Sequence, residues 1–132
     1  MSRALNDLSP AFRIYAVELL ARLVEAGVPV MIIDTLRTQA EQDEAVRTGH
    51  SKVKHSKHQD GLAIDLCPYE TFAQFGPDKL AWDRDNPAWA TIGKIVESLG
   101  MGWGGRFGES SPGAGDGWDP GHVQYKPPKI GD

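Results

Sequence analysis

The chain has 132 residues, of which 40% are hydrophobic and 24% are charged, as in an ordinary soluble globular protein. This length fits a single domain, residues 1–132, and the formal net charge of −4 argues against a protein that binds nucleic acid. The one cysteine, Cys67, excludes an intramolecular disulfide bond, so the core has to hold the fold together.

The first predicted element is a helix that begins at Ser9-Pro10 and ends before Gly27. Serine is a good helix cap, proline suits the first helical position, and glycine suits the residue that follows a helix. Apolar residues recur along this segment at the spacing of one helical face. We expect that face to be buried, namely Ile14, Val17, Leu20, Leu23 and Val24.

The same N-terminal segment bears on where the protein is made. It lacks the uninterrupted apolar stretch and the small-residue cleavage site of a signal peptide. No segment of the chain reaches the ~20 apolar residues of a membrane span either. We therefore expect no signal peptide, synthesis in the cytoplasm and no stable association with a membrane.

A strand and a second helix are predicted next. Residues 28–34, VPVMIID, form an apolar run rich in branched side chains and are predicted to be a buried strand. Thr38 and Glu41 make a capping-box pattern, which predicts a helix that runs to about Thr48. The polar residues 49–60 are predicted to form a loop.

The second half of the chain predicts two more strands and a third helix. GLAIDLC, residues 61–67, is predicted to be a strand with Asp65 and Cys67 on one face and Leu66 on the other. The third helix is predicted from residues 85–87, DNP, to Gly100. HVQY, residues 122–125, is predicted to be a short strand that follows a glycine-rich segment. We therefore predict an α+β fold, in which about three helices pack against a small antiparallel sheet.

Histidines and carboxylates are the residues that suggest chemistry. His58 and Asp65 are separated by Gly61, where a glycine allows a sharp bend, so the loop histidine can fold back over the strand. His122 stands at the start of the last predicted strand. Two histidines and one aspartate form a plausible zinc set, and three protein ligands mark a catalytic rather than a structural site. On spacing alone, solvated histidines and an Asp65 paired with a basic residue remain alternatives.

Two further residues are candidates for the chemistry itself. Asp119 lies three residues before His122, where a carboxylate beside a metal can act as a general base, although Asp-Pro-Gly is also ordinary turn chemistry. Asp116 competes with Asp119 for that role. Arg37, at the end of the first strand, can bind a carboxylate or a carbonyl, or simply pair with Glu41.

Other side chains have weaker claims to a functional role. His55 is a candidate for supporting the site or contacting substrate, whereas His50 is expected to be solvated. Cys67 shares the face of Asp65 but is expected to be a small core residue. The tryptophans divide into two pairs. Those expected in the core are Trp82 and Trp89, and those expected beside the site are Trp103 and Trp118.

Three segments resemble the motifs of a known enzyme family. Residues 56–65, SKHQDGLAID, are similar to the S-x-H-x-x-G-x-A-x-D motif of a zinc peptidase family. That family comprises D-alanyl-D-alanine carboxypeptidases, D-Ala-D-Ala dipeptidases and phage L-alanyl-D-glutamate endolysins. Residues 102–105, GWGG, and 119–122, DPGH, resemble its second signature, and residues 34–38 resemble a third, with Leu36 in place of the usual aromatic residue.

The resemblance implies a role for each candidate residue. His58, Asp65 and His122 would hold Zn²⁺ on the face of the sheet, Asp119 would be the general base for zinc-activated water, and Arg37 would polarise or anchor the substrate. The residues that would support the site or bind substrate are Ser56, His55 and Trp103.

The resemblance also implies a biological setting. We expect a zinc-dependent peptidase that hydrolyses peptidoglycan stem peptides, most simply at the L-Ala-D-Glu bond. Aspartate at position 119 is similar to the phage endolysins, and the small size, the expected lack of a signal peptide and the expected lack of a separate wall-binding domain agree with that resemblance. We expect a monomeric enzyme. Such an enzyme would degrade the bacterial cell wall and lyse the host cell after release by a holin-type membrane protein.

Three alternatives remain open at this point. The enzyme alternative is a D-Ala-D-Ala carboxypeptidase or dipeptidase. The second is a non-catalytic wall-binding module that zinc stabilises, and the third is a metal-free domain with surface histidines. The host, its wall chemistry and the origin of the gene are not encoded in these patterns.

Overall fold

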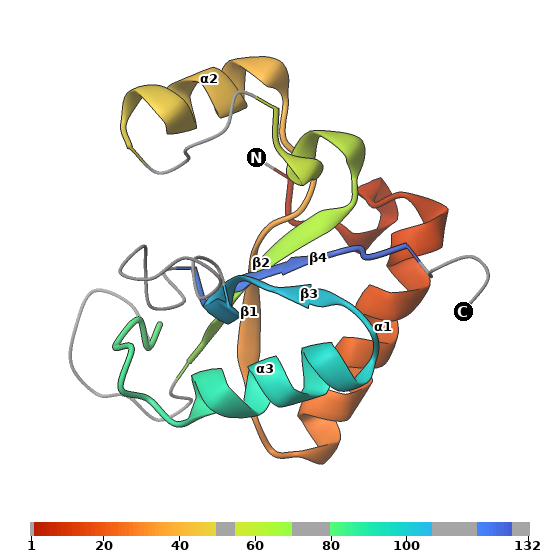
Figure 1. The fold of residues 1–132 in the computed structure, drawn as a ribbon, viewed down its shortest axis with the longest axis vertical. Helices are drawn as coiled ribbons and strands as arrows, with labels where there is room; N and C mark the ends of the chain where they lie inside the picture. The colour runs from red at the N-terminus through yellow and green to blue at the C-terminus, as the bar shows by residue number, and fades with distance from the viewer. Residues whose placement is uncertain (1, 50–54, 70–79, 107–118, 128–132) are drawn as a thin grey trace.

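The computed structural model describes residues 2–49, 55–69, 80–106 and 119–127 (Figure 1). The α-helices are α1 (Pro10–Glu25), α2 (Gln39–Arg47) and α3 (Ala88–Ser98), and the 3₁₀ turns are η1 (Leu5–Asp7), η2 (Lys57–Asp60) and η3 (Gly104–Arg106). The strands are β1 (Val30–Asp34), β2 (Ala63–Pro68), β3 (Gly102–Trp103) and β4 (His122–Gln124). None of the helices in these ranges is long and apolar enough to cross a membrane.

The strands form one antiparallel sheet in the order β1-β2-β4-β3, so the predicted α+β fold is confirmed. Most boundaries follow from the signals in the sequence. The side chain of Thr38 accepts a hydrogen bond from the Glu41 N–H while Glu41 bonds back to the Thr38 N–H, so the predicted capping box starts α2. Strand β3 is not predicted by the sequence, because two residues are too few to carry a periodic pattern.

Helices α1 and α3 pack together on one face of the sheet (Figure 1). The core between them and the sheet takes Ile64 from β2, Val123 from β4 and Ile92 from α3. Ile64 and Val123 are a directly paired couple across the two strands, whereas the next pair along, Asp65 and His122, points to the opposite face. The sheet therefore separates an apolar face covered by helices from a face that carries titratable groups.

The predicted apolar face of α1 is only partly the buried one, since of its five residues Leu23 is buried and Leu20 is half-buried. The side of α1 that enters the core carries Phe12, Ala16, Leu19 and Leu23. Ile14, Val17 and Val24 are exposed by 74%, 51% and 78%. Because apolar residues occur all around this helix, periodicity alone offers two apolar stripes, and packing against the sheet selects the one that carries the aromatic ring.

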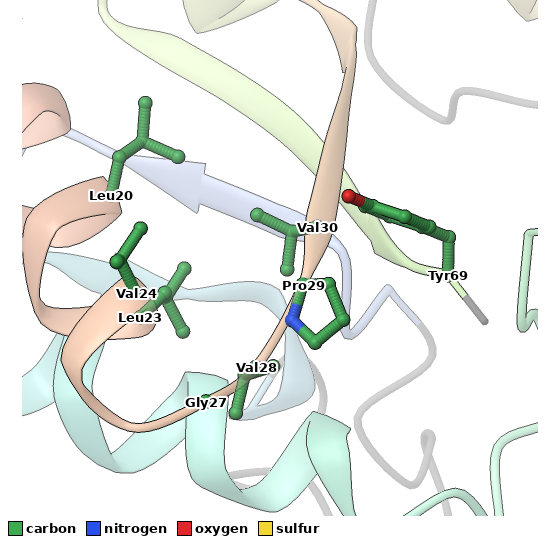
Figure 2. A pocket seen from close by; sticks show the side chains of 8 residues that line it. All are labelled: Leu20, Leu23, Val24, Gly27, Val28, Pro29, Val30 and Tyr69. Atoms are coloured by element: carbon green, nitrogen blue, oxygen red, sulfur yellow. The ribbon is translucent and has the colours of Figure 1, made fainter. Parts of the chain in front are cut away.

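An open apolar hollow lies where the end of α1 meets the sheet (Figure 2). It is lined by Leu20, Leu23 and Val24 of α1, by residues 27–30, and by Tyr69. These residues stand at the Val30–Pro68 end of the β1–β2 pair, opposite the end where Asp34 faces Asp65. The hollow is therefore separate from the titratable groups described below.

Two other expectations need correction. Trp82, expected in the core, is 52% exposed, because its ring stacks on the outside of the buried Trp89 at a centroid distance of 6.4 Å. Residues 57–60 form a 3₁₀ turn rather than loop. Ser56 and Gln59 cap that turn reciprocally, so the S-x-x-Q pattern is a signal for it.

Candidate metal and catalytic site

Strand pairing and one tight turn bring three side chains together on the face of the sheet opposite α1 and α3. Asp65 of β2 and His122 of β4 are directly opposite each other in the strand register. His58 comes from η2, which folds back over β2 through Gly61 at φ +70°. A Cβ at Gly61 would lie 2.7 Å from the Ser9 nitrogen, so the predicted need for glycine is both conformational and steric.

The three side chains meet at one carboxylate oxygen. Oδ1 of Asp65 lies 3.2 Å from His58 Nε2 and 3.2 Å from His122 Nδ1. One donor atom from each residue can be chosen so that all lie within 4.8 Å of one another. His58 is 1% exposed and His122 is 7% exposed, so the cluster is largely shielded from solvent.

The two imidazoles reach the cluster through different ring nitrogens. His58 Nδ1 lies 2.9 Å from the carbonyl oxygen of Thr35, which accepts its hydrogen and leaves Nε2 facing Asp65. His122 has the reverse arrangement, because its Nε2 lies 3.0 Å from Oε1 of Gln124 and its Nδ1 faces Asp65. Neither partner is among the predicted residues. Alternation along HVQ does place Gln124 on the face of His122, so a signal for it exists.

The donor set fits a divalent metal ion. His58 Nε2 is buried and has no hydrogen-bond partner among the residues that the structure describes, which is costly for a polar atom unless something else binds it. Two imidazole nitrogens and one carboxylate oxygen are donors that zinc prefers, and three protein ligands are typical of a catalytic site. Within the described part of the chain, the group has these three members.

The carboxylate of the cluster is held in its charged form. Burial alone would raise the pKa of Asp65, but its contacts with His122 and His58 hold that pKa well below the usual range. Burial alone would lower the pKa of His122, and its contact with Asp65 raises it overall. In the metal-free protein, Asp65 and His122 therefore each favour the charged form of the other.

Arg37 borders the cluster and is fixed by two buried side chains. Its Nε and Nη2 lie 3.2 and 2.7 Å from Oδ2 of Asp34, and its Nη1 lies 2.7 Å from Oε1 of Gln42. Nη2 is also 3.7 Å from Oδ2 of Asp65. Gln42, fully buried, is not among the predicted residues. It holds Arg37 from α2, so the predicted arginine is pre-positioned beside the cluster rather than free on the surface.

Asp119 lies in the turn that precedes β4. Its backbone oxygen accepts a hydrogen bond of 3.1 Å from the His122 N–H. Burial raises the pKa of Asp119, the charge of Asp65 raises it further, and the charges of His122, His58 and Arg37 oppose the shift. The carboxyl group of Asp119 therefore interacts electrostatically with the three proposed ligands and with Arg37.

Ser56 supports the cluster through the backbone of His58. Its Oγ accepts a hydrogen bond of 3.1 Å from the His58 N–H, at the start of the turn η2. The predicted supporting hydrogen bond is thus present, and it acts on the backbone of His58 rather than on its ring.

Other predicted residues stay apart from the cluster. The ring of His55 is exposed and pairs with Asp60 at 2.9 Å. Trp103 donates a hydrogen bond of 2.7 Å to the carbonyl oxygen of Pro120. It therefore braces the turn that carries Asp119. Cys67 is fully buried, as expected of a core residue. The remaining candidates, His50, Asp116 and Trp118, lie outside the described residues.

The chain matches the model of a known protein family. The family model described as D-alanyl-D-alanine carboxypeptidase matches residues 49–125, which is more than half of the chain. The matched range contains His58, Asp65, Asp119 and His122.

Several individual proteins are also similar to this chain in sequence or in fold. The peptidoglycan L-alanyl-D-glutamate endopeptidase CwlK of Bacillus subtilis (strain 168) is 28% identical over 116 residues, which cover 76% of this chain. The chain spans 66% of that relative's length, just under two thirds. The crystal structure of the Serratia marcescens L-Ala D-Glu endopeptidase ChiX is similar in fold, with a TM-score of 0.63 at 23% identity over 92% of this chain and 83% of that chain. VanYB in complex with D-alanine-D-alanine has a TM-score of 0.57 at 16% identity, over 89% of this chain and 71% of that chain.

Proposed function

The chain belongs to the peptidase family described as D-alanyl-D-alanine carboxypeptidase, and we propose that it is a zinc-dependent hydrolase of peptidoglycan stem peptides. The observation that carries the proposal is the buried cluster of His58, Asp65 and His122. Its polar atoms lie close together, and His58 Nε2, although 3.2 Å from Asp65 Oδ1, makes no hydrogen bond within the described part of the chain. An inert structural cluster would have satisfied that nitrogen.

In this proposal His58, Asp65 and His122 hold the metal. Zinc, when bound, supplies a Lewis acid that makes water a usable nucleophile near neutral pH. Asp119 accepts the proton of the attacking water and passes it to the leaving amine. Its raised pKa makes this carboxylate a stronger base than an ordinary aspartate.

Arg37 has an electrostatic role in the same proposal. Asp34 and Gln42 bind three of its N–H groups. This anchoring leaves one hydrogen each on Nη1 and Nη2 for the substrate. A guanidinium fixed before the reaction stabilises the negative charge that develops on the scissile carbonyl oxygen without reorganising.

We propose the L-Ala-D-Glu bond as the one that is cleaved. The support is the similarity to CwlK, whose name records that specificity, together with the fold shared with ChiX. The family description favours a second candidate, a D-alanyl-D-alanine carboxypeptidase. The two activities share the same catalytic groups and differ in the peptide that they accept.

Digestion of purified sacculi distinguishes the two specificities. The zinc-loaded protein is incubated with sacculi, and the new amino termini and the free amino acids are identified by mass spectrometry. The proposal predicts new D-Glu amino termini. Free D-alanine without new D-Glu termini would instead establish the carboxypeptidase activity, and no product at all would refute the enzyme proposal.

The phage endolysin role extends this proposal. We propose that residues 1–132 act as the catalytic unit of a monomer that is made in the cytoplasm and reaches the wall after holin-type release. The support is the endolysin-like aspartate at position 119. Expression in bacteria should cause lysis only when a holin is co-expressed. Lysis without a holin would contradict this route, and sedimentation of the purified protein tests the monomer.

A further inference from the structure

Gln124 has no role in the function proposed above, yet it contacts a residue of the cluster. We propose that Gln124 is a positioning residue that makes Nδ1 of His122 the metal-binding nitrogen, and that glycine at position 102 leaves room for the side chain of Gln124. The inference rests on the proposed zinc function, because it concerns how one ligand of that metal is oriented.

The strand geometry places Gln124 beside His122. The two residues are two positions apart in β4, so their side chains lie on the same face of the sheet. Oε1 of Gln124 lies 3.0 Å from Nε2 of His122, which is hydrogen-bonding distance. Nδ1 of the same ring lies 3.2 Å from Oδ1 of Asp65. The imidazole is therefore held between an acceptor within the cluster and an acceptor outside it.

These two acceptors compete for one proton. A neutral imidazole carries a single N–H, on Nδ1 or on Nε2. With the hydrogen on Nδ1, the ring bonds to Asp65 and has no lone pair for a metal within the cluster. With the hydrogen on Nε2, the ring bonds to Gln124 and Nδ1 is free to bind. Gln124 thus stabilises the tautomer that can act as a ligand.

The ring of His58 is oriented in the same way as that of His122, but through the opposite ring nitrogen. There the acceptor is the backbone carbonyl of Thr35, 2.9 Å from Nδ1, and the free nitrogen is Nε2. A backbone carbonyl cannot be removed by substitution, whereas the amide of Gln124 can. His122 is therefore the ligand whose orientation depends on a replaceable side chain.

Gly102 leaves room for the side chain of Gln124. It pairs with Gln124 across β3 and β4. A Cβ at Gly102 would lie 3.1 Å from Cγ and 3.6 Å from Nε2 of Gln124. An alanine would push the amide by a few tenths of an ångström. Glycine at position 102 therefore avoids a steric contact that would displace Gln124 from its position beside His122.

The test compares two replacements of Gln124 with a control substitution at a distant surface position. Gln124→Met keeps the length of the side chain but removes the acceptor, whereas Gln124→Glu keeps an acceptor. Zinc affinity is measured by competition with a chromophoric chelator, and the unfolding of the metal-free proteins is measured in parallel. Gln124→Met should bind zinc about 10- to 100-fold more weakly, and Gln124→Glu should bind at least as tightly as the wild type.

The control and the intermediate variant sharpen the comparison. Glu25→Met changes an exposed residue at the end of α1, away from the cluster, and should leave zinc affinity unchanged. Gly102→Ala should weaken binding less than Gln124→Met does. If Gln124→Met binds zinc like the wild type, or if Gln124→Glu is as weak as Gln124→Met, the positioning role is wrong.

Nitrogen NMR of the wild-type protein decides the question without relying on any variant. In the zinc-loaded protein, His122 should show a hydrogen on Nε2 and metal on Nδ1, and the reverse assignment would overturn the inference. A wild-type protein that binds zinc and cleaves sacculi with the reverse assignment contradicts only this inference. A wild-type protein that binds no zinc refutes the proposed function and this inference with it.

Discussion

Replacing Gly104 by alanine should damage the site more than it damages the fold. A Cβ at Gly104 would lie 2.0 Å from the backbone oxygen of Asp119 and 2.9 Å from Cβ of His122. The same oxygen of Asp119 accepts the hydrogen bond from the His122 N–H. The added methyl group therefore acts on the proposed base and on a proposed ligand at once.

The size of the effect follows from these distances. Real Cβ contacts essentially never fall under 3.0 Å, so the turn that carries Asp119 has to move by about 1 Å. Overpacking of this kind costs about 1–3 kcal/mol of stability. A displacement of about 1 Å at catalytic groups costs on the order of 10²-fold in rate.

Gly100→Ala is the matched control for this substitution. Gly100 has a φ of +81°, and nothing lies within 4 Å of the point that a Cβ would occupy, so alanine there adds backbone strain without a clash. That strain costs roughly 1–2 kcal/mol, which is similar to the expected loss in Gly104→Ala. Both variants are compared in chemical denaturation, zinc affinity and sacculus digestion. If Gly104→Ala matches Gly100→Ala in zinc affinity and rate, the reasoning is refuted.

Three further predictions concern other parts of the site. Asp119→Asn should keep its zinc yet lose about 10²- to 10⁴-fold in the rate of sacculus digestion, and an unchanged rate would remove Asp119 from the mechanism. Gln42→Leu removes one of the two buried acceptors of Arg37 and should cost about 1–3 kcal/mol in chemical denaturation, whereas Glu25→Leu, at an exposed position of α1, should stay within about 0.5 kcal/mol. Because its pKa is lowered in the folded state, Asp65 stabilises the metal-free protein above an unfolded-state pKa of about 3.9, and this stability is lost as the pH falls. Asp65→Asn should therefore show a smaller loss of stability on acidification below about pH 4, and an equal loss in both proteins would contradict the charge pairing.

The sequence is sufficient for those elements that carry local signals. Thr38 and Glu41 predict the start of α2, and the glycine at position 61 predicts the turn that returns His58 to the sheet. The meeting of His58, Asp65 and His122 is predictable because family motifs tie distant segments to one arrangement in space.

The partners that orient these groups are only partly predictable from the sequence. Gln42 acts through the rotation of α2, which local residue patterns do not encode, whereas alternation along β4 places Gln124 on the face of His122 without showing that the two side chains bond. The same limit explains the partly wrong face of α1, since a helix with apolar residues on every side is oriented only by what it packs against.

The zinc content of the purified protein tests the central claim most directly. The wild type and Asp65→Ala are dialysed against zinc and then against metal-free buffer, and bound metal is measured by mass spectrometry. The wild type is expected to retain about one zinc ion per chain, the number that three such ligands hold in a catalytic site, and Asp65→Ala is expected to lose it. A wild type without zinc, or an Asp65→Ala variant that retains as much zinc as the wild type, would contradict the proposed metal site.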